Sequence, residues 1–116
     1  MSNFVALVVE DDALQREAMT DLLKDQGFEV VECSTAEAAE LVLATTGTEL
    51  VALVTDISLA GDMSGIQLAE YAKRQFPRLN VVMVSGTGPP YIPVNTRFLM
   101  KPYRPSEFLD AVLSAS

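Results

Sequence analysis

The sequence lacks several residue types, and each absence excludes a kind of site or protein. It contains no histidine and one cysteine, Cys33, so an internal disulfide and a Cys/His zinc site are both excluded. We interpret Cys33 as a small apolar core residue. Lysine and arginine number 8 against 16 aspartates and glutamates, which gives a net charge of −8. Because proteins neutralise nucleic-acid phosphates with basic side chains, this balance argues against a nucleic-acid partner and favours cations or basic protein surfaces.

Long apolar runs and signal motifs are also missing. No apolar run approaches the roughly 20 residues that span a bilayer, and the amino terminus has no basic region followed by an apolar block. We therefore expect a cytoplasmic protein without a membrane partner. No G-x-G-x-x-G follows the first apolar run, which sets dinucleotide binding aside. With 116 residues, of which 49% are hydrophobic, the chain fits one globular domain over residues 1–116.

Five short apolar segments alternate with segments of helical periodicity. The segment Leu50–Asp56 is an almost unbroken apolar run that ends on a carboxylate, which is typical of a strand buried on both faces of a parallel sheet. Further strands are expected at residues 4–9, 28–33, 80–85 and 98–100, and helices are expected to begin at Asp12, Ser34, about Ser64 and Pro105. This alternation predicts right-handed crossovers and an α/β fold, with a parallel sheet covered on both faces.

Two of the predicted helix starts carry the pattern of a capping box. In this pattern a small polar side chain and a residue three positions later cap each other's backbone. Asp12 pairs with Gln15, and Ser34 pairs with Glu37. In the second of these helices we expect Leu41 to face the core, together with Ala38 and Val42.

The segment between the fourth and fifth strands departs from the alternation. Residues Gly86–Pro93 contain three prolines and two glycines, through which a regular helix cannot run. The whole segment up to Thr96 is also short for a crossover helix. We therefore expect the fourth helix of the fold to be short or replaced by a loop.

Chemically reactive side chains follow four of the five predicted strands. They are Glu10 and Asp11 after the first strand, Asp56 at the end of the third, Ser85 at the end of the fourth and Lys101 after the fifth. Because the carboxyl ends of parallel strands lie on one edge of a sheet, these residues should meet there. Three converging carboxylates repel one another, so the cluster favours a hard divalent cation such as Mg²⁺. The cation, the lysine and the hydroxyl could together surround a phosphoryl group carried on one carboxylate.

This pattern resembles the receiver domain of two-component response regulators over essentially the whole chain. The family's acidic pair matches Glu10 and Asp11, its phosphoacceptor matches Asp56, its hydroxyl matches Ser85, and its Lys-Pro pair matches Lys101 and Pro102. The resemblance implies a flavodoxin-like, doubly wound sheet of five parallel strands in the order 2-1-3-4-5, an order for which a receiver domain is itself a standard example.

The resemblance also implies the reaction. Asp56 would take a phosphoryl group from the phosphohistidine of a sensor histidine kinase or phosphotransfer protein, with Mg²⁺ as cofactor and Mn²⁺ as a possible substitute. The expected metal ligands are Glu10 acting through water, Asp11, Asp56 and the backbone carbonyl of Ser58. A domain of this kind catalyses only its own phosphorylation and dephosphorylation and is not otherwise an enzyme.

Further roles are implied for residues around the phosphoacceptor. Ser85 and Phe98 hold the positions of the family's switch pair, in which the hydroxyl moves toward the phosphoryl group and an aromatic ring turns inward. Phe98 lacks the hydroxyl of the tyrosine often found there. Ser58 and Thr87 hold the positions that tune the attack of water on the acyl phosphate. Both side chains are small, so we expect the phosphorylated state to decay without a dedicated phosphatase.

The segment Gly86–Thr96 stands where the fourth helix of the family forms much of the partner-binding face. The output surface is therefore expected to be a loop that orders on phosphorylation and binds a downstream protein target. The protein would be a monomer or a weak, phosphorylation-dependent dimer. The kinase is recognised in this family largely through the first helix, which here points to Leu14 to Leu22 and to the loop past Lys101.

Two other functions stay open. A pseudo-receiver would keep the fold as a protein-interaction module without phosphorylation, although the intact acids, hydroxyl and lysine argue against it. A small phosphohydrolase with Asp56 as nucleophile would be similar to haloacid dehalogenase-like phosphatases, but neither acidic strand is followed by an Asp-x-Asp pair. Because the sequence shows no effector domain after the last predicted helix, a stand-alone regulator and a receiver excised from a hybrid kinase or a longer regulator are both open.

Overall fold

The protein is built on a sheet of five parallel strands. The computed structural model describes residues 4–114, so residues 1–3 and 115–116 of the predicted domain lie outside the described part. The strands are β1 (Val5–Val9), β2 (Glu29–Cys33), β3 (Leu50–Asp56), β4 (Asn80–Ser85) and β5 (Arg97–Met100). Their order is β2-β1-β3-β4-β5, and every neighbouring pair is parallel. This confirms the flavodoxin-like fold and the predicted strand order.

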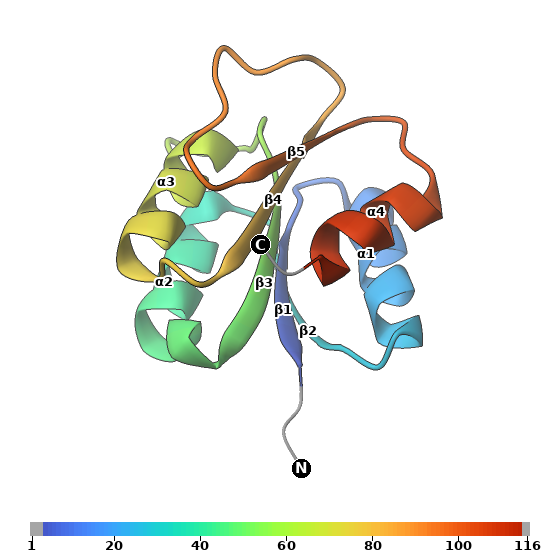
Figure 1. Ribbon diagram of the computed structural model, residues 1–116. Helices are drawn as coiled ribbons and strands as arrows, with labels where there is room; N and C mark the ends of the chain where they lie inside the picture. Colours follow the sequence, from blue (N-terminus) through green and yellow to red (C-terminus); the bar gives the residue numbers. More distant parts are fainter. Residues whose placement is uncertain (1–3, 115–116) are drawn as a thin grey trace.

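Helices cover both faces of the sheet (Figure 1). On one face lie α1 (Ala13–Asp25) and α4 (Pro105–Leu113), and on the other lie α2 (Ala36–Thr46) and α3 (Gly65–Gln75). A single 3-10 turn, η1 (Gly47–Glu49), connects α2 to β3. Between β4 and β5 the described chain forms a loop instead of a helix, as its prolines predict, so α4 is the helix after β5. Among residues 4–114, no helix is long and apolar enough to cross a membrane.

The central strands are buried because their side chains are apolar on both faces of the sheet. Successive side chains of a strand point to opposite faces, so each strand contributes to two cores. In β3, Leu53 packs into the core under α2 and α3, Val54 packs into the core under α1 and α4, and neither has exposed surface. Cys33 is buried in the first of these cores, as predicted. Because β3 is packed on both faces, its position is well defined, and so is the position of Asp56 at the carboxyl end of this strand.

The start of α2 differs from the prediction. Thr35, not Ser34, caps the helix, and its hydroxyl accepts a hydrogen bond from the amide N–H three residues later at 3.1 Å. The carboxylate of Glu37 does not return to the cap. It accepts hydrogen bonds at 3.0 Å from two backbone N–H groups of the loop after β3. Of the three residues expected to face the core, Ala38 and Val42 are partly buried and pack against it, but Leu41 is 69% exposed, because it lies on the opposite side of the helix from the buried positions two residues before and after it. The residues of α2 that are buried are Ala36, Ala39 and Leu43.

Candidate functional site

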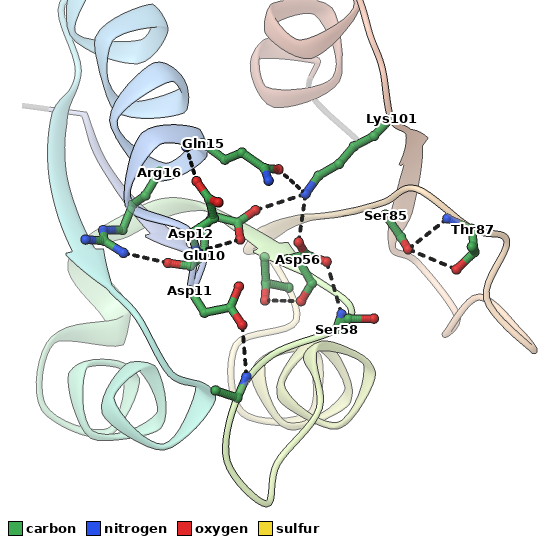
Figure 2. A network of polar contacts seen from close by, with 12 residues as sticks. Glu10, Asp11, Asp12, Gln15, Arg16, Asp56, Ser58, Ser85, Thr87 and Lys101 are labelled. Atoms are coloured by element: carbon green, nitrogen blue, oxygen red, sulfur yellow. Dashed lines mark hydrogen bonds and ion pairs between the residues drawn. The ribbon is translucent and has the colours of Figure 1, made fainter.

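Three carboxylates meet at the carboxyl edge of the sheet, where the sequence predicts them (Figure 2). Glu10 follows β1 and Asp56 ends β3, and only 1% and 7% of their respective surfaces are exposed. Asp11 is exposed. Each of the three offers one carboxylate oxygen, and these oxygens lie within 4.8 Å of one another. The three groups are therefore close enough to share one cation.

Lys101 places its ammonium group between two of these carboxylates. Its Nζ donates hydrogen bonds to Asp56 Oδ2 at 2.7 Å and to Glu10 Oε1 at 3.0 Å. The backbone N–H of Lys101 donates to the carbonyl of Ser85 at 2.8 Å, which fixes the start of the side chain beside the end of β4. A further hydrogen bond from Nζ goes to Gln15 Oε1 at 2.6 Å. The lysine thus connects the ends of β1, β3 and β5 with the first turn of α1.

Burial and the neighbouring charges shift the pKa values of Glu10 and Lys101. Burial, with Asp56 nearby, raises the pKa of Glu10 to about 7, although hydrogen bonds from the Asp12 backbone and from Lys101 act in the opposite direction. Burial alone would lower the pKa of Lys101, but the hydrogen bonds and charges of Asp56 and Glu10 outweigh it and raise that pKa. The lysine therefore stays protonated. Its single positive charge does not fully compensate the negative charge of the carboxylates. The remaining negative charge favours a divalent cation.

The backbone around Asp56 holds the second oxygen of its carboxylate. Oδ1 accepts a hydrogen bond from the backbone N–H of Ser58 at 3.0 Å, so both oxygens of Asp56 have a donor. The side chain of Ser58 is exposed beside them. On the other side of the site, Asp11 Oδ2 accepts from the backbone N–H of Ala60 at 3.2 Å. The loop after β3 is thereby attached to two of the three carboxylates.

The hydroxyl of Ser85 lies at the same edge of the sheet but is turned toward its own loop. Ser85 is 4% exposed, and its Oγ accepts a hydrogen bond from the backbone N–H of Thr87 at 3.2 Å, with Thr87 Oγ1 at 3.5 Å. Figure 2 shows this pair to one side of the carboxylates. Phe98, in β5, is half-buried and packs against the core under α2 and α3. The predicted switch residues are therefore on neighbouring strands, β4 and β5.

Two residues of α1 contact the site without having been predicted. The backbone N–H of Gln15 donates to Asp12 Oδ1 at 2.9 Å, which confirms Asp12 as the N-cap. The side chain of Gln15 does not complete the expected capping box, because it is engaged by Lys101. Arg16 Nη1 donates to the backbone carbonyl of Glu10 at 2.8 Å. The signal in the sequence is their position, since both lie in the first turn of the helix that follows the acidic pair.

The oxygen donors of the site fit the predicted metal. Carboxylate oxygens are the ligands that Mg²⁺ and Mn²⁺ prefer, and the cluster contains no sulfur or nitrogen ligand. Asp11 and Asp56 carry hydrogen bonds from backbone N–H groups that orient their carboxylates. The site therefore has the donor chemistry and the charge that a hard divalent cation needs.

The fold and this site agree with a comparison against known protein families. A family model described as the response regulator receiver domain matches residues 6–113. The chain belongs to this family. Receiver domains are parts of two-component signal-transduction systems, and they bind Mg²⁺ through acidic residues such as those clustered here.

Individual relatives support the assignment. Nodulation protein W of Bradyrhizobium diazoefficiens is 32% identical over 120 residues, which cover 97% of this chain and 51% of that protein. The response regulator FleR of Pseudomonas aeruginosa is 35% identical over 112 residues, which cover 91% of this chain and 23% of that protein. This receiver domain therefore spans about half the length of the first relative and about a quarter of the second. The crystal structure of a response regulator receiver protein from Sinorhizobium medicae superimposes with a TM-score of 0.82 at 25% identity, covering 95% of this chain and 91% of the other.

Proposed function

We propose that this receiver domain accepts a phosphoryl group on Asp56 from the phosphohistidine of a sensor histidine kinase or phosphotransfer protein. The observation that carries the proposal is the position of the Lys101 ammonium, which lies 2.7 Å from Asp56 Oδ2 and also donates a hydrogen bond to the buried Glu10. In the transfer, a carboxylate oxygen of Asp56 bonds to phosphorus as the phosphorus–nitrogen bond breaks. The electron pair leaves with the imidazole, which retains or takes up a proton.

Each neighbouring group has a role in this proposal. Lys101 donates a hydrogen bond to the phosphoryl oxygens and opposes the charge that develops on them. Glu10 acting through water, Asp11, Asp56 and the Ser58 carbonyl would hold Mg²⁺ or Mn²⁺, which supplies further positive charge to the same oxygens. The backbone N–H of Ser58 keeps the carboxylate of Asp56 oriented through its hydrogen bond at 3.0 Å.

Two exposed side chains are proposed to set the lifetime of the acyl phosphate. Ser58 and Thr87 are small and lie beside the reacting carboxylate and the switch hydroxyl, so they leave room for water. The phosphoryl group is then lost by hydrolysis at Asp56 without a dedicated phosphatase. The domain accordingly acts on no substrate other than its own phosphoryl group, and we infer a location in the cytoplasm, where kinases have access to ATP.

The signal would leave the site through β4, β5 and the loop between them. Phosphorylation adds negative charge at Asp56, which draws the Ser85 hydroxyl away from Thr87 and lets the ring of Phe98 turn inward. The loop of residues 86–96 is attached directly to Ser85, so its conformation changes with the hydroxyl. A downstream protein would bind the changed loop, and the domain would act as a monomer or a weak dimer.

Phosphorylation of the wild-type protein is expected to add one phosphoryl group, and the Asp56→Asn protein is expected to add none. Asparagine keeps the size of the side chain but removes the nucleophilic carboxylate oxygen. Intact-protein mass is measured after incubation with acetyl phosphate and Mg²⁺, beside a sample with chelator, in which no adduct should form. If the wild-type protein takes up no phosphoryl group even when short-lived adducts are trapped, the protein is a pseudo-receiver. Loss of the adduct over time in the same samples measures the lifetime.

The Tyr91→Phe substitution is expected to loosen the loop without affecting the rest of the fold. Tyr91 Oη donates to Glu70 Oε2 on α3 at 2.9 Å, which attaches one side chain from the middle of the loop to the protein. Removing this hydroxyl should speed amide hydrogen exchange in residues 86–96 by a few-fold, because local opening becomes easier. Exchange is followed by mass spectrometry of peptides. Glu70→Gln keeps an acceptor oxygen and should change exchange less than Glu70→Ala. Equal exchange in all four proteins would show that another contact holds the loop.

A further inference from the structure

We propose that Gln15 is a positioning residue for phosphoryl transfer, because its side chain anchors the ammonium group of Lys101. This inference rests on the proposed function of Asp56. The carbonyl oxygen of the Gln15 side chain lies 2.6 Å from Lys101 Nζ. Gln15 is on α1, and Lys101 lies 86 positions later in the sequence. The residue is exposed, yet its side chain reaches into the polar network at the edge of the sheet (Figure 2).

The hydrogen-bond capacity of Lys101 indicates why this contact matters. An ammonium has three N–H donors, and here they are directed to Asp56, Glu10 and Gln15. Asp56 is the phosphoacceptor, so its contact with Lys101 must change when its charge moves to the phosphoryl oxygens. Glu10 belongs to the candidate metal ligands and would share its charge with a bound cation. Gln15 is the one partner among the three that neither reacts nor belongs to the cluster of acids.

The backbone fixes Gln15 in the position that this role needs. Its N–H donates to Asp12 Oδ1 at 2.9 Å, and the N–H of Asp12 donates to Glu10 Oε2 at 3.1 Å. Glu10 Oε1 then accepts from Lys101, whose third bond returns to Gln15. These four residues form a closed ring of hydrogen bonds. The ring ties the start of α1 to the lysine, so the contact at Gln15 is part of a connected network.

The chemistry of an amide suits this position. The amide oxygen accepts a hydrogen bond from the ammonium and brings no further negative charge to a site that already has three carboxylates. Gln15 therefore restrains Lys101, but it does not compete with the reacting oxygens for the ammonium group as an additional carboxylate would. The restraint keeps the ammonium directed toward Asp56 before, during and after the transfer. Loss of the restraint would leave a charged but more mobile lysine.

The test compares two substitutions at Gln15 with a control. Gln15→Met keeps the length of the side chain and its helix propensity but has no acceptor oxygen, whereas Gln15→Glu keeps an acceptor oxygen. Gln75→Met makes the same chemical change at an exposed position at the far end of α3. A small donor, acetyl phosphate with Mg²⁺, is used so that docking of a kinase does not contribute to the rate.

Two quantities are measured. The first is the nitrogen-15 ammonium signal of Lys101 by nuclear magnetic resonance, in the metal-free and unphosphorylated protein. We expect this signal to show slow proton exchange in the wild-type, Gln15→Glu and Gln75→Met proteins and to be lost by fast exchange in Gln15→Met. The second is the rate at which the adduct at Asp56 forms. We expect it to be roughly five- to tenfold lower in Gln15→Met, which corresponds to the net contribution of one ordinary hydrogen bond.

The outcomes separate this inference from the proposed function. An adduct that forms equally fast in the wild-type and Gln15→Met proteins overturns the role of Gln15 and leaves phosphorylation of Asp56 intact. A slower adduct in Gln15→Met with an unchanged Lys101 signal also overturns it, because the effect would then bypass the lysine. If the wild-type protein forms no adduct, both the proposed function and this inference fail.

Discussion

Replacing Lys101 with methionine is expected to slow phosphorylation of the receiver domain by roughly a hundredfold or more, the loss found when a group that stabilises transition-state charge is removed. Methionine occupies similar space, but it has no charge and donates no hydrogen bond. In the proposed reaction, the ammonium of Lys101 meets the charge that develops on the phosphoryl oxygens, starting from its contact with Asp56 Oδ2 at 2.7 Å. The rate is measured by intact-protein mass with acetyl phosphate and Mg²⁺.

The same substitution should lower the free energy of unfolding by about 1–3 kcal/mol, because two buried carboxylates lose the donor they share. These are Glu10 and Asp56, whose side chains are 1% and 11% exposed. Mg²⁺ should restore part of the loss, since an ion that binds only the folded protein stabilises it. Urea denaturation with and without Mg²⁺ measures both effects.

The control for Lys101→Met is Lys24→Met, in the exposed last turn of α1, which should leave the rate and the stability close to wild type. A normal rate of phosphorylation in the Lys101→Met protein would contradict the catalytic role. Lower stability alone would then show that Lys101 only holds the buried carboxylates together.

The fold could be predicted from the sequence because its signals are local. An apolar run too short for a helix indicates a buried strand, and alternation of such strands with helices indicates a parallel sheet. The candidate site followed from the same pattern, because residues at the carboxyl ends of parallel strands share one edge. Glu10, Asp56 and Lys101 were each placed by this rule alone. The order of the strands came from the resemblance to the family.

Polar contacts between distant segments could not be predicted in this way. The sequence pattern assigned the side chains of Gln15 and Glu37 to capping their own helices. In the structure each is engaged by another segment: Gln15 by Lys101, and Glu37 by the loop after β3. Local and distant partners compete for the same side-chain oxygens, and only the folded chain brings the distant partner close.

For the loop between β4 and β5, the sequence predicted the absence of a helix but not the conformation of the loop. Its prolines exclude a helix, and the structure has none among residues 86–96. The conformation of the loop depends on contacts that the composition does not encode, such as the hydrogen bond from Tyr91 to Glu70. The composition of the segment therefore predicted that it is not a helix, whereas its conformation is determined by tertiary contacts.

Replacing Gly65 with alanine is expected to lower the free energy of unfolding by about 3 kcal/mol, the upper end of the range for overpacking. Gly65 is buried at the start of α3, where the chain passes close to the end of β3. A Cβ there would lie 1.9 Å from the backbone carbonyl oxygen of Asp56 and 2.7 Å from Ile57 Cα. Backbone atoms relieve such a clash less easily than the end of a side chain does.

The clash at Gly65 would disturb Asp56, the proposed phosphoacceptor, because hydrogen bonds hold both segments in place. The N–H of Gly65 donates to the carbonyl of Ile57 at 2.9 Å, and the N–H of Ile57 donates to the carbonyl of Val84 at 3.0 Å. Either α3 moves away from β3, or the backbone of Asp56 shifts. A shift of Asp56 disturbs its contact with Lys101, so phosphorylation should slow together with the loss of stability.

Gly88→Ala is the matched control for Gly65→Ala, because no atom lies within 4 Å of a Cβ at Gly88. It makes the same chemical change in the loop before β5 and should keep the unfolding midpoint of the wild-type protein. Urea denaturation and the rate of adduct formation are measured for both variants. If Gly65→Ala matches Gly88→Ala in both, the approach of α3 to β3 does not restrain Asp56. A loss confined to stability would show that α3 can move while the carboxylate stays in place. Loss of both would show that the close approach at Gly65 helps to orient Asp56, the proposed phosphoacceptor.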